Sequence, residues 1–108
     1  MKPNNQQAQA MKQLQKMQAE MAKVQDELAN TEVEESVGGG AVKVAMTGDL
    51  RVTRVDIDPR ALDPDDVEVL EDMVVAAVNG VVAKAKELES RRMNSIVGGL
   101  GLPSGLGF

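Results

Sequence analysis

Apolar residues in the first part of the chain recur with the period of a helix. From Gln6 to Asn30 the sequence contains no glycine or proline and is dominated by Gln, Ala, Met, Lys and Glu, most of which favour helix. The apolar positions alternate steps of four and three residues, which is the spacing of a heptad seam: Ala10, Leu14, Met17, Met21, Val24 and Leu28. Because such a seam requires a partner helix, Leu14, Met17, Met21, Val24 and Leu28 are predicted to form a helix-to-helix dimer contact.

The pattern then changes to the alternation that is typical of strands. Residues 31–58 are rich in β-branched side chains and are interrupted at Gly38-Gly39-Gly40 and at Gly48-Asp49, which predicts a three-stranded antiparallel meander. The alternation shifts phase between Val52 and Val55, which indicates a β-bulge in the third strand.

The middle strand of this meander is predicted over residues 41–47. Val42, Val44 and Met46 lie on one face and Lys43 and Thr47 on the other. Since successive side chains of a strand point to opposite faces, one face of the sheet is expected to be buried.

A second helix is predicted from about Pro64 to near Asn94. Asp63-Pro64-Asp65-Asp66 combines a capping side chain, a proline at the first helical position and acids in the first turn, all favourable at a helix N-terminus. Gly80 either costs the helix about 1 kcal/mol or allows a close neighbour. The apolar stripe consists of Val67, Leu70, Val74, Ala77, Val78, Val81, Ala85 and Leu88.

These elements define a single α+β domain over residues 1–96, followed by a Gly/Leu-rich tail over 97–108 that is expected to be flexible. A helix of about 25 residues is about 37 Å long, whereas a compact domain of 100 residues has a radius of gyration of about 13 Å. The helices are therefore expected to project beyond the sheet, and a homodimer is expected to cover their apolar faces.

Composition removes several classes of function. The chain has no Cys, His, Trp or Tyr, and its single aromatic residue is Phe108. These absences exclude disulfides and thiolate sites, and they argue against an enzyme, a metal or other cofactor, a small-molecule substrate, and binding by base stacking. Because no run of eighteen apolar residues occurs, the protein is expected to be cytoplasmic and to lack membrane contacts.

Two motifs suggest chemistry but favour structural interpretations. Gly38-Gly39-Gly40 is followed by a strand, whereas a phosphate-binding P-loop is followed by Lys and Ser or Thr at the start of a helix, so a hairpin turn is predicted. An acidic group is interpreted as turn and cap residues rather than a cation site, since it lacks EF-hand spacing: Asp56, Asp58, Asp63, Asp65 and Asp66.

Charge is segregated along the chain, although the net charge is -5. Residues 1–30 carry +1, residues 31–72 carry −8, and residues 73–108 carry +2. The helical ends are therefore basic and the middle is acidic, so a polyanion would be attracted to the helices and repelled by the sheet.

Basic side chains on both helices are candidates for contacts with such a polyanion. Lys12, Lys16 and Lys23 fall within about 40° of one another on the side opposite the seam. On the second helix, Lys84 and Arg91 share a stripe, with Arg92 beside it. Each of these residues, taken singly, is also explained as a solvated surface cation.

Several motifs in order resemble the YbaB/EbfC family of bacterial nucleoid-associated proteins, and the resemblance covers nearly the whole chain. They are the Met/Gln/Lys-rich first helix, Gly38-Gly39-Gly40-Ala41-Val42-Lys43-Val44, Val55-Asp56-Ile57-Asp58-Pro59, Leu62-Asp63-Pro64, residues 70–79, and Gly98-Gly99-Leu100-Gly101-Leu102-Pro103.

The resemblance implies a tweezers-like homodimer with a β-sheet core that binds double-stranded DNA through its helical arms. No motif marks individual contact residues, so Lys12, Lys16, Lys23, Lys84, Arg91 and Arg92 rest on charge and spacing alone. The alternative is a prefoldin-like holdase or a coiled-coil interaction protein, because methionine-rich helices suit promiscuous apolar surfaces.

Overall fold

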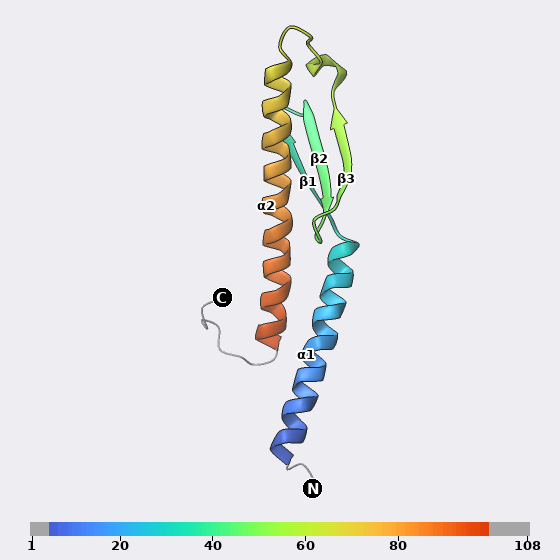
Figure 1. The fold of residues 1–108 in the computed structure, drawn as a ribbon, viewed down its shortest axis with the longest axis vertical. Helices are drawn as coiled ribbons and strands as arrows, with labels where there is room; N and C mark the ends of the chain where they lie inside the picture. The colour runs from blue at the N-terminus through green and yellow to red at the C-terminus, as the bar shows by residue number, and fades with distance from the viewer. Residues whose placement is uncertain (1–4, 100–108) are drawn as a thin grey trace.

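A computed structural model describes residues 5–99 of the chain as two long helices joined by a small sheet (Figure 1). Its elements in order are α1 (Asn5–Ala29), β1 (Glu32–Val37), β2 (Val42–Thr47), β3 (Val52–Ile57), a short 3₁₀ turn η1 (Pro59–Ala61) and α2 (Val67–Gly99). The molecule measures 76 × 25 × 18 Å and has a radius of gyration of 20.7 Å. The predicted α+β arrangement with projecting helices is confirmed.

The sheet is an antiparallel meander in the order β1-β2-β3. Ala45 pairs with Arg54 but Met46 pairs with Val52, so Thr53 is an extra residue in β3. This is the bulge that the phase shift in the sequence predicted. It places Val52 on the same face of the sheet as Val55 and Ile57, which would otherwise be out of phase with it.

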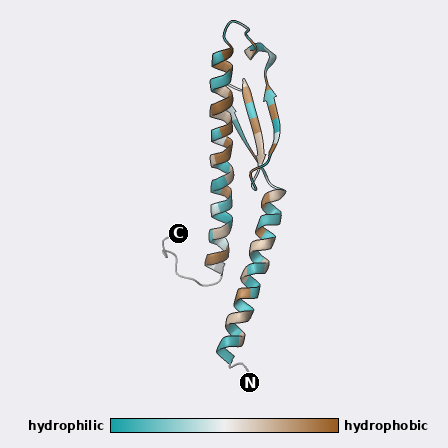
Figure 2. Cartoon of the chain, viewed as in Figure 1, coloured by the Kyte–Doolittle hydropathy of each residue, from teal (hydrophilic) through white to brown (hydrophobic). Residues whose placement is uncertain are grey.

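The core lies between the sheet and the first half of α2, which packs against β1 and β2. Its buried side chains are Val42, Val44 and Met46 from β2 together with Ala77, Val81 and Ala85 from α2. The predicted buried face of β2 is therefore confirmed. Figure 2 shows the apolar residues of α2 concentrated in the half beside the sheet, while α1 is largely hydrophilic.

Small residues on α2 allow the helix to approach the sheet closely. A Cβ atom at Gly80 would lie 2.6 Å from Glu35 Oε2, which is closer than packed atoms tolerate. Of the two interpretations of Gly80 that its sequence position left open, the structure supports close approach of a neighbouring element.

The C-terminal end of α1 is joined tightly to the turn between β2 and β3. The amide of Gly48 donates to the carbonyl oxygens of both Leu28 and Thr31 at 2.9 Å. Leu28 is only 1% exposed, and a Cβ atom at Gly48 would lie 2.7 Å from Leu28 Cδ2. From this joint α1 extends away from the sheet and past the C-terminal end of α2 (Figure 1).

We call α1 the N-terminal arm. The part of α2 that follows Ala85, the last α2 residue buried against the sheet, is the C-terminal arm.

Both ends of α2 differ from the sequence prediction. The helix begins at Val67 rather than Pro64, because Asp63 forms a turn of its own: its side chain accepts from the amide of Asp65 at 2.9 Å and its carbonyl accepts from Asp66 at 3.0 Å. The helix also continues to Gly99, past its predicted end near Asn94. Residues 100–108 of the predicted tail lie outside the described residues.

We predict that Gly48→Ala lowers the free energy of unfolding by about 1–3 kcal/mol, because the added methyl group would overlap the fixed Leu28. Gly98→Ala is the control, since a Cβ there meets nothing within 4 Å and alanine should favour the helix by up to about 1 kcal/mol. Urea unfolding followed by circular dichroism measures both, and equal effects of the two substitutions would contradict the tight joint.

Candidate nucleic-acid interface

Three lysines of the N-terminal arm form an accessible basic surface. Lys12, Lys16 and Lys23 are all exposed, and within residues 5–99 none of their ammonium groups has a hydrogen bond or ion pair. Met17 is the first α1 residue packed against α2, so Lys12 and Lys16 precede the region where the two arms touch. Their charges are therefore available to an external ligand.

Two of the three predicted basic residues on α2 are instead engaged with other elements. Lys84 Nζ donates to the carbonyl oxygen of Glu34 at 2.9 Å and lies 3.5 Å from Glu35 Oε1. Arg92 Nη1 donates to Glu27 Oε2 at 3.1 Å. These contacts tie α2 to β1 and to α1 respectively, so the two cations are partly neutralised.

The remaining cations of α2 are Arg91 and Lys86. Both are exposed, and neither guanidinium nor ammonium group has a partner among the described side chains. Lys86 was missed because it lies about 200° around the helix from Lys84, outside the predicted basic stripe. A free cation on that side could have been found only by knowing which face of α2 meets the sheet.

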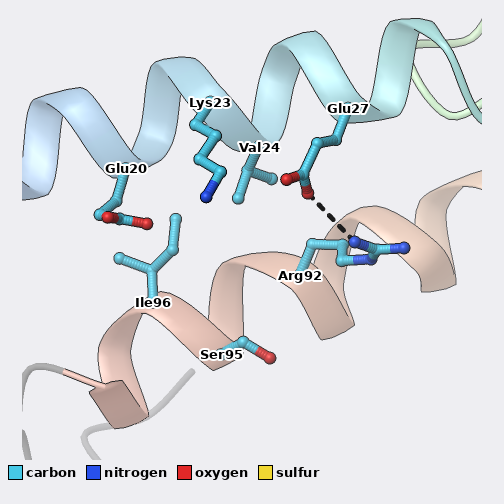
Figure 3. A pocket seen from close by; sticks show the side chains of 7 residues that line it. All are labelled: Glu20, Lys23, Val24, Glu27, Arg92, Ser95 and Ile96. Atoms are coloured by element: carbon cyan, nitrogen blue, oxygen red, sulfur yellow. Dashed lines mark hydrogen bonds and ion pairs between the residues drawn. The ribbon is translucent and has the colours of Figure 1, made fainter.

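The two arms enclose a small open cavity of about 210 Å³ near their contact (Figure 3). Lys23 from α1 and Arg92 from α2 both line it, so the structure brings these two predicted residues together. Its other lining residues are Glu20, Val24, Glu27, Ser95 and Ile96. With two acids beside two bases, the cavity has no net charge and does not resemble an anion site by itself.

The heptad seam of α1 is partly filled within the chain. Val24 and Leu28 are buried against Ile96 of α2, and Met17 packs beside them. Leu14 and Met21, by contrast, are 56% and 42% exposed. The partner helix for the C-terminal half of the seam is therefore α2 of the same chain, which the heptad pattern could not distinguish from a second copy.

Acidic side chains gather on the face of the sheet that α2 does not cover. Arg54 stands among three of them, 2.5 Å from Glu34, 2.8 Å from Asp56 and 3.5 Å from Glu32. The hydrogen bond to Asp56 is the largest cause of the raised pKa of Arg54. The basic arm and the acidic sheet predicted from the sequence are thus separated in space.

The motifs that could suggest other chemistry have structural roles. Gly38, Gly39 and Gly40 all have positive φ and form the turn between β1 and β2, as predicted. Asp58 accepts hydrogen bonds from the side chain and from the backbone amide of Arg60. Both hydrogen bonds lower the pKa of Asp58, and the side-chain hydrogen bond has the larger effect. Within residues 5–99 no three acidic residues are grouped in a way that could hold a metal ion.

None of the helices in the described part of the chain is both long and apolar enough to span a membrane.

Comparison with known proteins identifies the class. The model of the YbaB/EbfC DNA-binding family matches residues 2–100. A protein named nucleoid-associated protein from Pelotomaculum thermopropionicum is 48% identical over 93 residues, which cover 86% of this chain and 89% of that one. Another of the same name from Dictyoglomus turgidum is 47% identical over 97 residues, covering 90% and 93%. The chain belongs to the YbaB/EbfC DNA-binding family.

A solved structure supports the fold independently. The chain is similar to the uncharacterized protein HP0035 from Helicobacter pylori, with a TM-score of 0.67 and 24% sequence identity. The match covers 93% of this chain and 100% of that one. At this identity the similarity concerns the fold alone.

The contacts of the α2 lysines lead to a stability prediction. Lys84→Met should lower the free energy of unfolding by about 1 kcal/mol, because the half-exposed hydrogen bond to Glu34 is lost. Lys86→Met removes the same charge two residues later and should change stability by less than about 0.5 kcal/mol. Thermal and urea unfolding compare the two, and indistinguishable variants would show that Lys84 does not hold α2 against β1.

Proposed function

We propose that this protein is a nucleoid-associated protein that binds double-stranded DNA as a homodimer, mainly by contacts from its basic arms to phosphates. The family and the names of its relatives support DNA as the ligand. The observation that carries the proposal is the set of exposed lysines without side-chain partners on α1, a helix that extends away from the acidic sheet (Figure 1).

This surface is suited to charge recognition rather than to reading bases. A lysine ammonium is a point charge that neutralises phosphate and releases counterions, whatever the sequence of the duplex. Phe108 is the single aromatic residue of the chain, so the chain lacks a series of aromatic side chains on which successive bases could stack. Little sequence preference is expected.

A surface for dimerisation is provided by β3. Its inner-face residues pair across the sheet with buried residues of β2: Ile57 with Val42, Val55 with Val44 and Val52 with Met46. Yet Val52, Val55 and Ile57 are 52%, 50% and 38% exposed, because α2 covers β1 and β2 but does not reach across β3. We call these three residues the uncovered face.

The neighbouring flank of α2 extends the uncovered face. Lys84 contacts β1, and Val75 lies about 180° around the helix from Lys84, on the side away from β1. Val75 is 59% exposed, and Val78 and Val82 on the same flank are only partly buried against the core. Together β3 and this flank form a contiguous apolar surface, which soluble monomers rarely expose.

A second copy of the chain is the occupant that we propose for this surface. The monomer is elongated and buries few apolar side chains, and a small core usually needs association for stability. A homodimer would also double the number of basic arms, so that one duplex could meet lysines from both chains. Leu14 and Met21, the exposed half of the predicted seam, are a second apolar surface available for association.

The holdase alternative has one observation in its favour. Met11 and Met21 on the N-terminal arm are 62% and 42% exposed, and flexible thioethers suit variable apolar clients. DNA binding is preferred because the family model describes it and because the arm carries unpaired lysines beside these methionines.

DNA binding is tested by changing Lys12, Lys16 and Lys23 together to Gln. If the dimer neutralises roughly four to eight phosphates, the log–log slope of affinity against salt should lie between about −4 and −7 for the wild type. The variant should bind at least about tenfold more weakly, and its slope should flatten by about 1 for each lost phosphate contact. Mobility shifts with a random duplex across salt concentrations measure both quantities.

The matched control changes Lys43, Arg51 and Arg60 to Gln. It removes the same number of positive charges, but from the sheet and the turns next to it. It should bind DNA within about twofold of the wild type if the arms make the contacts. Equal losses in both variants would show that net charge alone governs binding, and no duplex binding by the wild type at low salt would exclude the function.

Dimerisation through the uncovered face predicts that Val55→Asp converts the dimer to a monomer. Burying an unpaired carboxylate in an apolar interface costs several kcal/mol, whereas the same group on an exposed β3 costs the monomer little. Sedimentation equilibrium at micromolar concentration measures the change. Ser36→Asp, an exposed position on β1, is the control and should remain dimeric; a dimeric Val55→Asp protein would place the interface elsewhere.

A further inference from the structure

The N-terminal arm is held to the rest of the chain over a short region. Its joint at Gly48 fixes only the last turn of α1. Beyond that joint, the buried contact with α2 consists of Val24, Leu28 and Ile96, with Met17, Leu88 and Met93 at its edge. The arm therefore has few apolar contacts that could fix the angle between α1 and α2.

The packing beside this cluster is also incomplete. The cavity of about 210 Å³ opens between the arms directly next to Val24 and Ile96 (Figure 3). Close-packed side chains resist small displacements, whereas side chains that line an open cavity do not. A polar contact between the two helices beside this cavity therefore affects their spacing more than the same contact would in a well-packed core.

Glu27 and Arg92 supply that contact. The Arg92 guanidinium spans from α2 to Glu27 on α1 with a donor distance of 3.1 Å, and both residues line the cavity. Figure 3 shows the Arg92 side chain directed at the Glu27 carboxylate across the gap between the helices. Both side chains are about two-fifths exposed, so such a pair contributes little to stability. The single hydrogen bond nevertheless limits the distance between the two helices at this point.

We propose that the Glu27–Arg92 pair sets the spacing of the two arms, and that Arg92 supports DNA binding through this spacing rather than by contacting phosphate. The expected effect on DNA binding rests on the proposed function, whereas the expected effect on arm spacing does not. Arg92 is thus a positioning residue, whereas Lys12, Lys16 and Lys23 are the contact residues. Arg91 and Lys86, whose charged groups have no partner within residues 5–99, are the α2 residues that remain available to phosphate.

The two roles of Arg92 predict opposite effects of Glu27→Gln. If Arg92 contacts phosphate, removing Glu27 releases the guanidinium and adds one net positive charge, so DNA binding strengthens. If the pair sets arm spacing, Glu27→Gln weakens DNA binding by about threefold to tenfold despite the favourable charge change. The salt slope of Arg92→Gln separates the roles again: it stays at the wild-type value for a positioning residue and falls by about 1 for a phosphate contact.

A charge exchange provides the rescue. Glu27→Arg combined with Arg92→Glu keeps the net charge and allows the same pair to form in the opposite direction. Affinity for DNA should return to within about twofold of the wild type if spacing is what matters. A doubly exchanged protein that binds as weakly as Arg92→Glu alone would overturn the proposal.

Arm spacing is measured without DNA by electron–electron distance spectroscopy. The chain has no cysteine, so Gln13→Cys on α1 and Ser90→Cys on α2, both exposed positions, accept spin labels selectively. Labelled protein is diluted with excess unlabelled protein so that each measured pair belongs to one chain. The distance distribution should broaden in Glu27→Gln and narrow again in the charge exchange, with circular dichroism confirming equal helix content.

These measurements keep the two proposals distinct. A wild type that does not bind DNA would refute the proposed function and the DNA part of this inference, while the distance distributions would still decide arm spacing. An unchanged distribution in Glu27→Gln, or stronger DNA binding by that variant, would refute the role assigned to the Glu27–Arg92 pair.

Discussion

The whole arrangement depends on how one helix packs on a three-stranded sheet. α2 is held by Val42, Val44 and Met46 of β2 against Ala77, Val81 and Ala85, where small side chains let the helix lie close. A single helix about 10 Å wide covers about two strands spaced at about 4.8 Å. β1 and β2 are therefore covered, and the inner face of β3 is left open. The same packing directs the second half of α2 beyond the sheet, where it meets α1.

Much of this fold is predictable because each element has a strong local signal. The heptad spacing of α1, the alternation in β2 and the phase shift at Val52 and Val55 all describe short-range geometry, and the structure agrees with them. The start of α2 was predicted three residues early because Asp63 can cap a helix or close a turn, and local sequence does not distinguish the two. Here its side chain accepts from Asp65 within a turn.

The partners of side chains are less predictable, because they lie far apart in the sequence. Lys84 and Glu34 are 50 residues apart, and Arg92 and Glu27 are 65 apart. Charge and helical spacing placed Lys84 and Arg92 in a basic stripe, but they could not show that each already had an acceptor. For Lys12, Lys16, Lys23 and Arg91 no such side-chain acceptor exists within the described residues, so these four predicted residues keep their free charges.

The attachment of α1 at one end makes it a lever. From Val24, where the arm is packed against α2, to the helix start at Asn5 is about 28 Å of helix. Lys12 lies 12 residues, or about 18 Å, from Val24, so a tilt of about 10° at the packed end would displace it by about 3 Å, close to the 3.4 Å rise per nucleotide along one strand of a duplex. If the arm binds DNA as proposed, a tilt of this size where the arms touch would change how its distal lysines align with successive phosphates, so the register of the arm would be decided far from the DNA itself.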